Sequence, residues 1–177
     1  MRKENERCVY LIEVPAGLVP VSFKEGSGNV INYTISIPFT QFYILCNYDA
    51  GTILSIYMSV TKTPLVAIEQ EIFVAPYLNI FSQGKGNVCT GSMQIPQDVS
   101  LKLKVDATVS TFFEADFNAD LSPTPFSSLG SFTNAANYIK KWAKLTAEDR
   151  FFACAPAAIY AKHPDTPAKI IERIVVQ

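Results

Sequence analysis

The segment Val30-Ile-Asn-Tyr-Thr-Ile-Ser-Ile37 alternates apolar or aromatic residues with polar ones. This period of two residues is typical of a β-strand that is buried on one face. The more continuous apolar run from Gln41 to Asn47 indicates a central strand, and Leu54 to Val60 alternates again. Between these two, Asn47-Tyr-Asp-Ala-Gly51 has the length and composition of a hairpin turn. The region therefore predicts neighbouring antiparallel strands.

Shorter strands are expected on both sides of this region. Val9 to Val14 and Val19 to Phe23 flank Pro15-Ala-Gly17, and this arrangement predicts a first hairpin. Glu71 to Ala75 predicts a short last strand that ends at Pro76. We therefore expect an antiparallel β-meander over about residues 8–75.

The second half of the chain has the spacing of three to four residues that is typical of amphipathic helices. One helix is predicted from Asp106 to Asn118 and another from Asn134 to Leu145. The apolar stripe of the first helix consists of Val105, Val109, Phe112, Phe113 and Phe117. That of the second helix consists of Ala135, Tyr138, Ile139, Trp142 and Leu145. Thr146 followed by Asp149 predicts a short helix through Ala157, and Thr166-Pro167 predicts the start of a last one.

The order of these elements predicts an α+β fold. We expect a single domain over residues 1–177, with strands over about 8–75, a cysteine-bearing loop over about 76–97 and helices over about 104–177. Ser122 to Gly130 is predicted to be a loop between the first two helices. A chain of 177 residues is long enough for one domain with a sizeable core.

The composition excludes several classes of function. Fifteen basic and sixteen acidic residues give a net charge of −1, which leaves no electrostatic signal for nucleic acid or an anionic membrane. The lysines at 140, 141 and 144 predict a solvated helix face. The apolar run from Val9 to Ile12 is too short for a signal peptide, and no run is long enough for a membrane helix.

Four cysteines, Cys8, Cys46, Cys89 and Cys154, are widely spaced and form no C-x-x-C pair. A chain this apolar does not need disulfides, so we expect four free thiols and a cytoplasmic protein. With one histidine in the chain, the sequence predicts no zinc site and no cofactor.

The segment Asn79-Ile-Phe-Ser-Gln-Gly-Lys-Gly-Asn-Val-Cys-Thr-Gly-Ser92 carries the strongest signal for chemistry. A cysteine acts as a nucleophile through its thiolate, which needs access and stabilisation. Gly84, Gly86 and Gly91 predict a backbone with positive φ and an uncrowded sulfur at Cys89.

Two asparagines are candidates to stabilise an oxyanion at Cys89. Asn79 offers its side-chain amide if the loop folds back, and one such donor contributes on the order of 10²–10³ in rate. Loop ordering is an equally good account of Asn79. Asn87 is the rival candidate, although a turn residue is the simpler interpretation there. The only histidine, His163, precedes a proline and has no features of a catalytic base.

A cysteine without a histidine base is suited to transthiolation, in which one thiol replaces another as acyl carrier. At this point the motif Pro76-Tyr-Leu-Asn79 with Gly86-Asn-Val-Cys89-Thr-Gly91 resembles the active-site segment of ubiquitin-conjugating (E2) enzymes. It is more similar still to divergent prokaryotic E2-like proteins, the type called PRTRC system protein B or prokaryotic E2 family D. The resemblance implies a UBC-like fold with a meander, a cysteine loop and C-terminal helices.

By this resemblance, Cys89 holds a ubiquitin-like modifier as a thioester and Asn79 matches the asparagine of the oxyanion element. The implied partners are an E1-like adenylating enzyme and a ubiquitin-like protein. Acidic residues of the next helix, Glu114 and Asp116, would orient an incoming lysine. The chain departs from the E2 pattern because Tyr77 and Leu78 replace the histidine-proline pair and no helix is predicted before the first strand.

Three interpretations stay open on the sequence. The chain is a conjugating enzyme that transfers the modifier to an amine or another acceptor, a non-catalytic E2-like adaptor, or a structural β-rich protein of a phage or mobile element. In the last case Cys89 is only a small apolar residue in a turn. The enzymatic interpretation requires a solvent-reachable thiol on an open bend. Cys46 is expected in the core, and Cys8 and Cys154 are expected to be structural.

Overall fold

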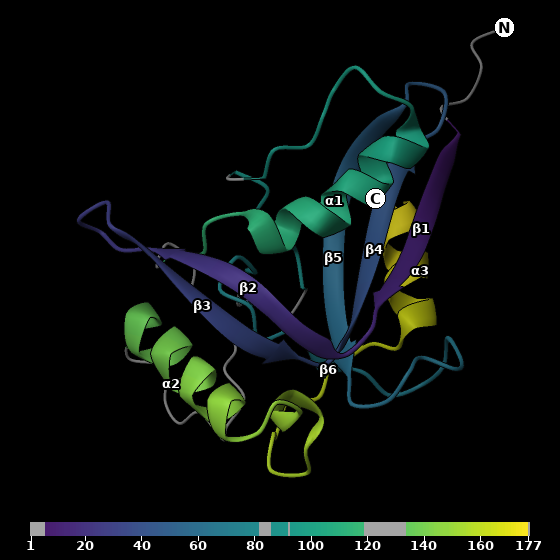
Figure 1. The fold of residues 1–177 in the computed structure, drawn as a ribbon. Coiled ribbons are helices and arrows are strands. Elements are labelled where there is room, and N and C mark those ends of the chain that lie inside the picture. The colour runs from purple at the N-terminus through teal and green to yellow at the C-terminus, as the bar shows by residue number, and fades with distance from the viewer. Residues whose placement is uncertain (1–5, 82–85, 92, 119–133, 177) are drawn as a thin grey trace, which may run out of the picture.

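The computed structural model describes residues 6–81, 86–91, 93–118 and 134–176. The described part has an α+β architecture with antiparallel strands followed by helices (Figure 1), as predicted. Its elements are β1 (Arg7–Val14), β2 (Gly17–Lys24), β3 (Val30–Ile37), β4 (Phe39–Asn47), β5 (Thr52–Thr61), β6 (Phe73–Val74), α1 (Leu101–Glu114), α2 (Ala135–Glu148), the 3-10 helix η2 (Phe152–Cys154) and α3 (Pro167–Val176).

The strands pair differently from the predicted meander. β1 pairs with β4 and β2 pairs with β3, so the first hairpin predicted around Pro15-Ala-Gly17 is wrong. The register is continuous: Val14 lies opposite Thr40 and Gly17 lies opposite Ile37. One long two-stranded ribbon is therefore bent where Pro15 and Pro38 interrupt it, because proline has no N–H to donate to a ladder.

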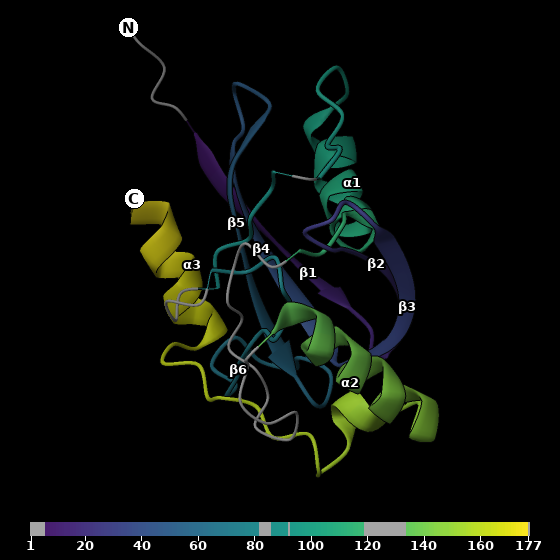
Figure 2. The same ribbon diagram turned by 90° about the vertical axis from the view of Figure 1, so that its left-hand side faces the viewer.

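The main sheet has the strand order β1-β4-β5-β6, and its central strands are buried on both faces. One face packs into the main apolar core, which includes Phe42, Met58 and Phe112 of α1. The other face forms a second apolar cluster, whose buried members are Tyr43, Leu45, Tyr57, Ile72, Ile170 and Ile174. Figure 2 shows α1 and α3 on opposite sides of the sheet. This double burial explains the continuous apolar run of β4.

The helix α2 lies along the outer edge of β3 (Figure 1) and caps its backbone at Ser36. The Ser36 N–H donates to Thr146 Oγ1 at 2.9 Å, and Trp142 Nε1 donates to the Ser36 carbonyl at 2.9 Å. Covering an edge strand in this way prevents it from pairing with another chain. The predicted helix from Thr146 through Ala157 is wrong. Thr146 lies inside α2, and only the short η2 follows.

The first helix begins earlier than predicted. The Ser100 side chain accepts a hydrogen bond from the Leu103 N–H, so α1 starts at Leu101, five positions before Asp106. It ends at Glu114, and the following residues pair with β2 through hydrogen bonds of Phe117 with Ser22 and Lys24. The predicted loop from Ser122 to Gly130 lies outside the described residues.

Candidate active site

Cys89 lies at the end of a short antiparallel ladder. Its N–H donates to the Asn79 carbonyl at 2.8 Å, and the Phe81 N–H donates to the Asn87 carbonyl at 2.9 Å. On the other side, the Val88 N–H donates to the Ile56 carbonyl of β5 at 3.0 Å. Residues 86–89 therefore form a strand-like segment between β5 and residues 79–81.

This pairing corrects the expectation of an open bend throughout residues 79–92. The ladder reaches Cys89 and stops there, and a turn closed by the Met93 N–H and the Thr90 carbonyl follows. Cys89 is half-buried, and it belongs to neither apolar cluster. A Cβ added to Gly91 would lie 3.8 Å from the Cys89 sulfur, so an alanine there would come into van der Waals contact with the thiol. The backbone of the nucleophile candidate is fixed, while its side chain is partly accessible.

Of the three glycines in this segment, Gly86 has the conformation that the sequence predicts. Its φ is +69°, and a Cβ at this position would overlap the carbonyl oxygen of Met58. The close approach allows the Met58 N–H to donate to the Gly86 carbonyl at 2.8 Å, which anchors the segment on β5. Gly91 has no positive φ, and Gly84 lies outside the described residues.

Asn79 is 4% exposed and ties the cysteine segment to the end of α1. Its side-chain Nδ2 donates to the Asp116 carbonyl at 3.4 Å, while its own carbonyl accepts the Cys89 N–H. The neighbouring Phe117 is in turn paired with β2. These two hydrogen bonds fit the loop-ordering role predicted for Asn79, and the bond to Asp116 uses one N–H of its amide.

The residues before Asn79 are held by α2. The Tyr138 hydroxyl donates to the Pro76 carbonyl at 2.8 Å, and the Tyr77 hydroxyl bonds Thr40 Oγ1 at 2.6 Å. The Tyr77 ring is fully buried and stacks on Trp142, with ring centroids 5.8 Å apart. Burial raises the pKa of Tyr77, so its hydroxyl stays protonated. Sequence reasoning missed this support, because Trp142 and Tyr77 are far apart in the chain.

The other polar candidates have different surroundings. Asn87 lies in the ladder opposite Tyr57 and not in a turn, and its Oδ1 is buried without a hydrogen-bond partner in the described structure. Glu114 is exposed and lines a cavity between α1 and β2, away from the ladder. Asp116 is half-buried, and its backbone contacts Asn79.

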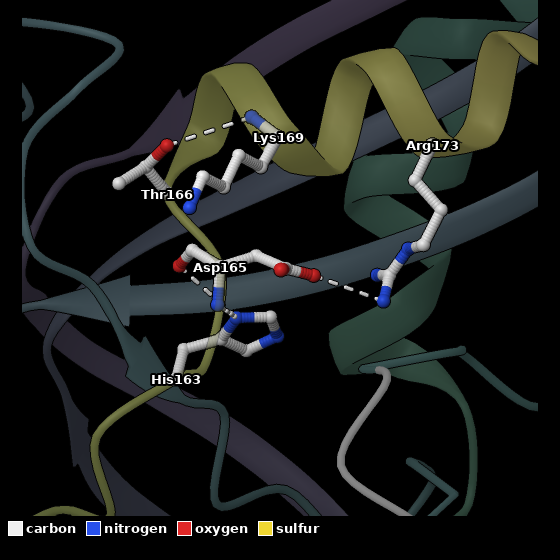
Figure 3. A network of polar contacts seen from close by, with 5 residues as sticks. All are labelled: His163, Asp165, Thr166, Lys169 and Arg173. Carbon is white, nitrogen blue, oxygen red and sulfur yellow. Dashed lines mark hydrogen bonds and ion pairs between the residues drawn. The ribbon is translucent and has the colours of Figure 1, made fainter.

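His163 lies in the connection just before α3, next to Asp165 (Figure 3). It is 2% exposed, and its Nδ1 accepts the Asp165 N–H at 3.0 Å. Asp165 also forms an ion pair with Arg173 at 2.9 Å. Burial lowers the pKa of His163, and the nearby Asp165 opposes this shift. All these contacts lie in the connection to α3 and in α3 itself.

The remaining cysteines have thiols whose pKa values are raised by burial. Cys46 is fully buried in the main apolar core, and burial raises its pKa to about 12. Cys8 lies opposite Cys46 in the sheet, and burial raises its pKa as well. Burial also raises the pKa of Cys154 in η2. All four thiols are free, as predicted.

The ladder and its cysteine lie inside a region that matches a known family model. The model is described as prokaryotic E2 family D, and it matches residues 14–151. The chain belongs to prokaryotic E2 family D. Membership associates it, at the level of the family, with ubiquitin-like conjugation and with E1-like or ubiquitin-like partners in general.

The family match includes β2 to β6, the cysteine segment, α1 and α2, whereas α3 and nearly all of β1 lie outside it. Searches of curated proteins and of solved structures found no match. Among the described helices, none has the length and apolar character needed to cross a membrane.

Proposed function

We propose that this protein is an E2-like conjugating enzyme that carries a ubiquitin-like modifier as a thioester on Cys89. The observation that carries this proposal is the position of Cys89, a half-buried thiol at the end of a backbone-anchored ladder in a chain of this family. Burial raises the pKa values of the thiols of Cys8, Cys46 and Cys154, which disfavours their thiolate forms.

The proposed reaction has two steps. The Cys89 thiolate attacks the carbonyl carbon of the modifier's thioester on the E1-like partner, and the partner's sulfur leaves as a thiolate. A neutral amine or another acceptor then attacks the carbonyl carbon of the Cys89 thioester, the C–S bond breaks to release Cys89 as a thiolate, and the proton of the acceptor passes to solvent water. The first step requires no histidine base, because one thiolate replaces another as the acyl carrier.

We assign Asn79 to this site as a positioning residue, through the hydrogen bond of its carbonyl with the Cys89 N–H. The N–H of its amide that does not face Asp116 is the proposed donor to the oxyanion. Replacing Asn79 by Ala is expected to lower the charging rate about 10²-fold if that donor acts. If Asn79 has only a structural role, Asn79→Ala should lower the melting temperature. The charging rate measured below that temperature should then change little.

The direct test combines the protein with its E1-like partner, the modifier and ATP. Wild type should form an adduct that a thiol reductant cleaves, and Cys89→Ser should form an ester that resists it. Cys154→Ser is the matched control, because that thiol is also half-buried but lies in η2. Absence of the adduct in wild type, or its persistence in Cys89→Ala, would exclude this function.

A second candidate is a non-catalytic adaptor that binds the same partners. One observation favours it: the amide of Asn79 already donates to the Asp116 carbonyl. An adaptor would bind the E1-like partner or the modifier with the same affinity after Cys89→Ala, and it would form no reductant-sensitive adduct.

A further inference from the structure

β1 is an edge strand of the main sheet, and its outer side is unpaired. It stands first in the strand order β1-β4-β5-β6, and Figure 1 shows it at the border of the sheet. Among the described residues, no segment bonds the backbone of β1 on the side away from β4. A row of free backbone groups of this kind is a template for another strand.

The other strands at the ends of the two sheets are protected. α2 caps β3, and on β6 the Val74 N–H donates to the Ala161 carbonyl at 2.9 Å. On β2, Phe117 bonds the end of the strand, and Pro20 has no N–H to offer. β1 has neither device, because its centre is the uncharged run Cys8-Val-Tyr-Leu-Ile12, which contains no proline. Its edge is therefore open to a partner.

Hydrogen bonds at two places fix which backbone groups of β1 face outward. The Tyr48 N–H donates to the Glu6 carbonyl at 2.8 Å, and the β1–β4 register is continuous from there. Even-numbered residues of β1 therefore bond β4. The Met58 N–H, which bonds Gly86 on the far side of β5, gives the same alternation through the regular part of the β4–β5 register. The outward N–H and carbonyl groups belong to Arg7, Val9, Leu11 and Glu13.

Two charged residues of β1 lack an ionic partner among the described residues. Arg7 is exposed, and its guanidinium donates to the Val175 carbonyl at 3.3 Å. Glu13 is half-buried, and its Oε2 accepts hydrogen bonds from the Leu65 N–H and from Gln41 Nε2, both at 2.8 Å. Its Oε1 accepts none of the hydrogen bonds in the described part of the chain. Because both residues have odd numbers, their side chains lie on the same face of the strand.

We propose that β1 pairs with β1 of a second copy of this chain, antiparallel, about a twofold axis at Tyr10. In this register Arg7 lies opposite Glu13 of the second copy, and Val9 lies opposite Leu11. All four carry outward groups, so each of these pairs exchanges two N–H···O bonds. A register shifted by one residue would set outward groups against groups that already bond β4. A register shifted by two would separate the opposite charges.

The pairing joins two four-stranded sheets into one sheet of eight strands. Tyr10 then faces its own copy in a pair without hydrogen bonds, where side chains approach most closely. The cysteine segment lies on the far edge of β5, so both Cys89 thiols stay outside the interface. The family match begins at residue 14, so the proposed interface is not part of what membership implies. It is also independent of the proposed function.

Sedimentation velocity over a range of protein concentrations tests the assembly. Wild type should form a species of twice the 19.5 kDa mass of the chain. Arg7→Glu turns both opposite-charge pairs into like-charge pairs, so it should raise the Kd of the dimer about tenfold or more. Arg150→Glu is the control, because it makes the same charge change at an exposed residue just after α2. The control should leave the Kd unchanged.

Cysteine crosslinking tests the register. Val9→Cys, Tyr10→Cys and Leu11→Cys are each introduced into protein whose less buried cysteines are replaced, with Cys8→Ser, Cys89→Ser and Cys154→Ser. With oxidised glutathione as the oxidant, Tyr10→Cys should form the most intermolecular disulfide, because only residue 10 faces its own copy. Registers shifted by two residues would instead crosslink Val9→Cys or Leu11→Cys.

Three results would overturn the proposed dimer. They are a monomer at every concentration, a Kd that Arg7→Glu leaves unchanged, and crosslinking that is strongest at Val9→Cys or Leu11→Cys. A monomeric wild type would leave the edge of β1 to a strand of a different protein. Neither measurement involves charging of Cys89, so the dimer and the proposed function succeed or fail separately.

Discussion

At the scale of single residues, Gly86 sets the position of the cysteine segment. Its positive φ and the lack of a side chain let the backbone contact Met58 of β5, and Cys89 follows three positions later. An alanine here would meet both a strained φ and the Met58 carbonyl oxygen. Gly51 has a similar φ of +61° but open space around it. Gly51→Ala therefore measures the cost of the positive φ without the steric overlap that Gly86→Ala adds.

We expect Gly86→Ala to lower the free energy of unfolding by roughly 3 kcal/mol, against about 1 kcal/mol for Gly51→Ala. The larger loss would come from displacing residues 86–88 from β5. Urea unfolding measures both values. Amide exchange at Val88 in the Gly86→Ala protein would show whether its bond to Ile56 is lost. Equal costs for the two variants would mean that the segment shifts without strain.

At the scale of elements, α2 stabilises β3 by capping an edge that has no neighbouring strand among the described residues. The Ser36 N–H is buried, so an apolar replacement of its acceptor leaves it without a hydrogen bond. The Ser36 carbonyl has a separate partner in Trp142, and the Ser36 hydroxyl accepts the Ala153 N–H at 3.2 Å.

Thr146→Val keeps the shape of the side chain and removes the acceptor. We expect it to lower the free energy of unfolding by about 1–3 kcal/mol. Thr108→Val is the matched control, because the buried Thr108 hydroxyl donates to the Lys104 carbonyl within α1. The control should cost about 1 kcal/mol or less. Thermal or urea unfolding measures the loss of stability in each variant. Similar losses for Thr146→Val and Thr108→Val would show that the edge cap contributes little.

The local sequence predicted most elements but not their partners. Alternation located β3 and β5, and the Thr166-Pro167 pair located the start of α3, since these signals are local. Pairing depends on contacts that are distant in the chain, so the local sequence around Pro15-Ala-Gly17 predicts a hairpin turn where the structure has a bend of the ribbon. At the site, Cys89 and Asn79 stood out by type and spacing. The ladder that holds Cys89 and Asn79, and the stacking of Tyr77 on Trp142, could not be predicted from the local sequence.

At the scale of the whole molecule, α3 closes the second face of the sheet. Ile170 and Ile174 are fully buried against Tyr43 and Tyr57, and His163 lies in the connection that leads to α3. Because burial lowers the pKa of His163 in the folded state, the unfolded chain binds a proton more readily.

The stability of the fold should therefore depend on pH through His163. As the pH falls through the unfolded value of about 6.5, the unfolded state gains a proton that the folded state does not, and the free energy of unfolding decreases. The slope from one such group is at most about 1.4 kcal/mol per pH unit. Urea unfolding between pH 7.5 and 5.5 checks it, and His163→Gln should show a shallower decrease than wild type. Parallel curves for the two proteins would contradict the assignment.

The cap on β3 also has a consequence for biosynthesis. Ser36 and its partners are 110 and 106 positions apart, so a ribosome finishes β3 long before α2 exists. At about 5–20 residues per second, the nascent ribbon waits roughly 5–20 s with that edge uncovered. During this interval the uncovered edge is a template on which a neighbouring polypeptide can pair.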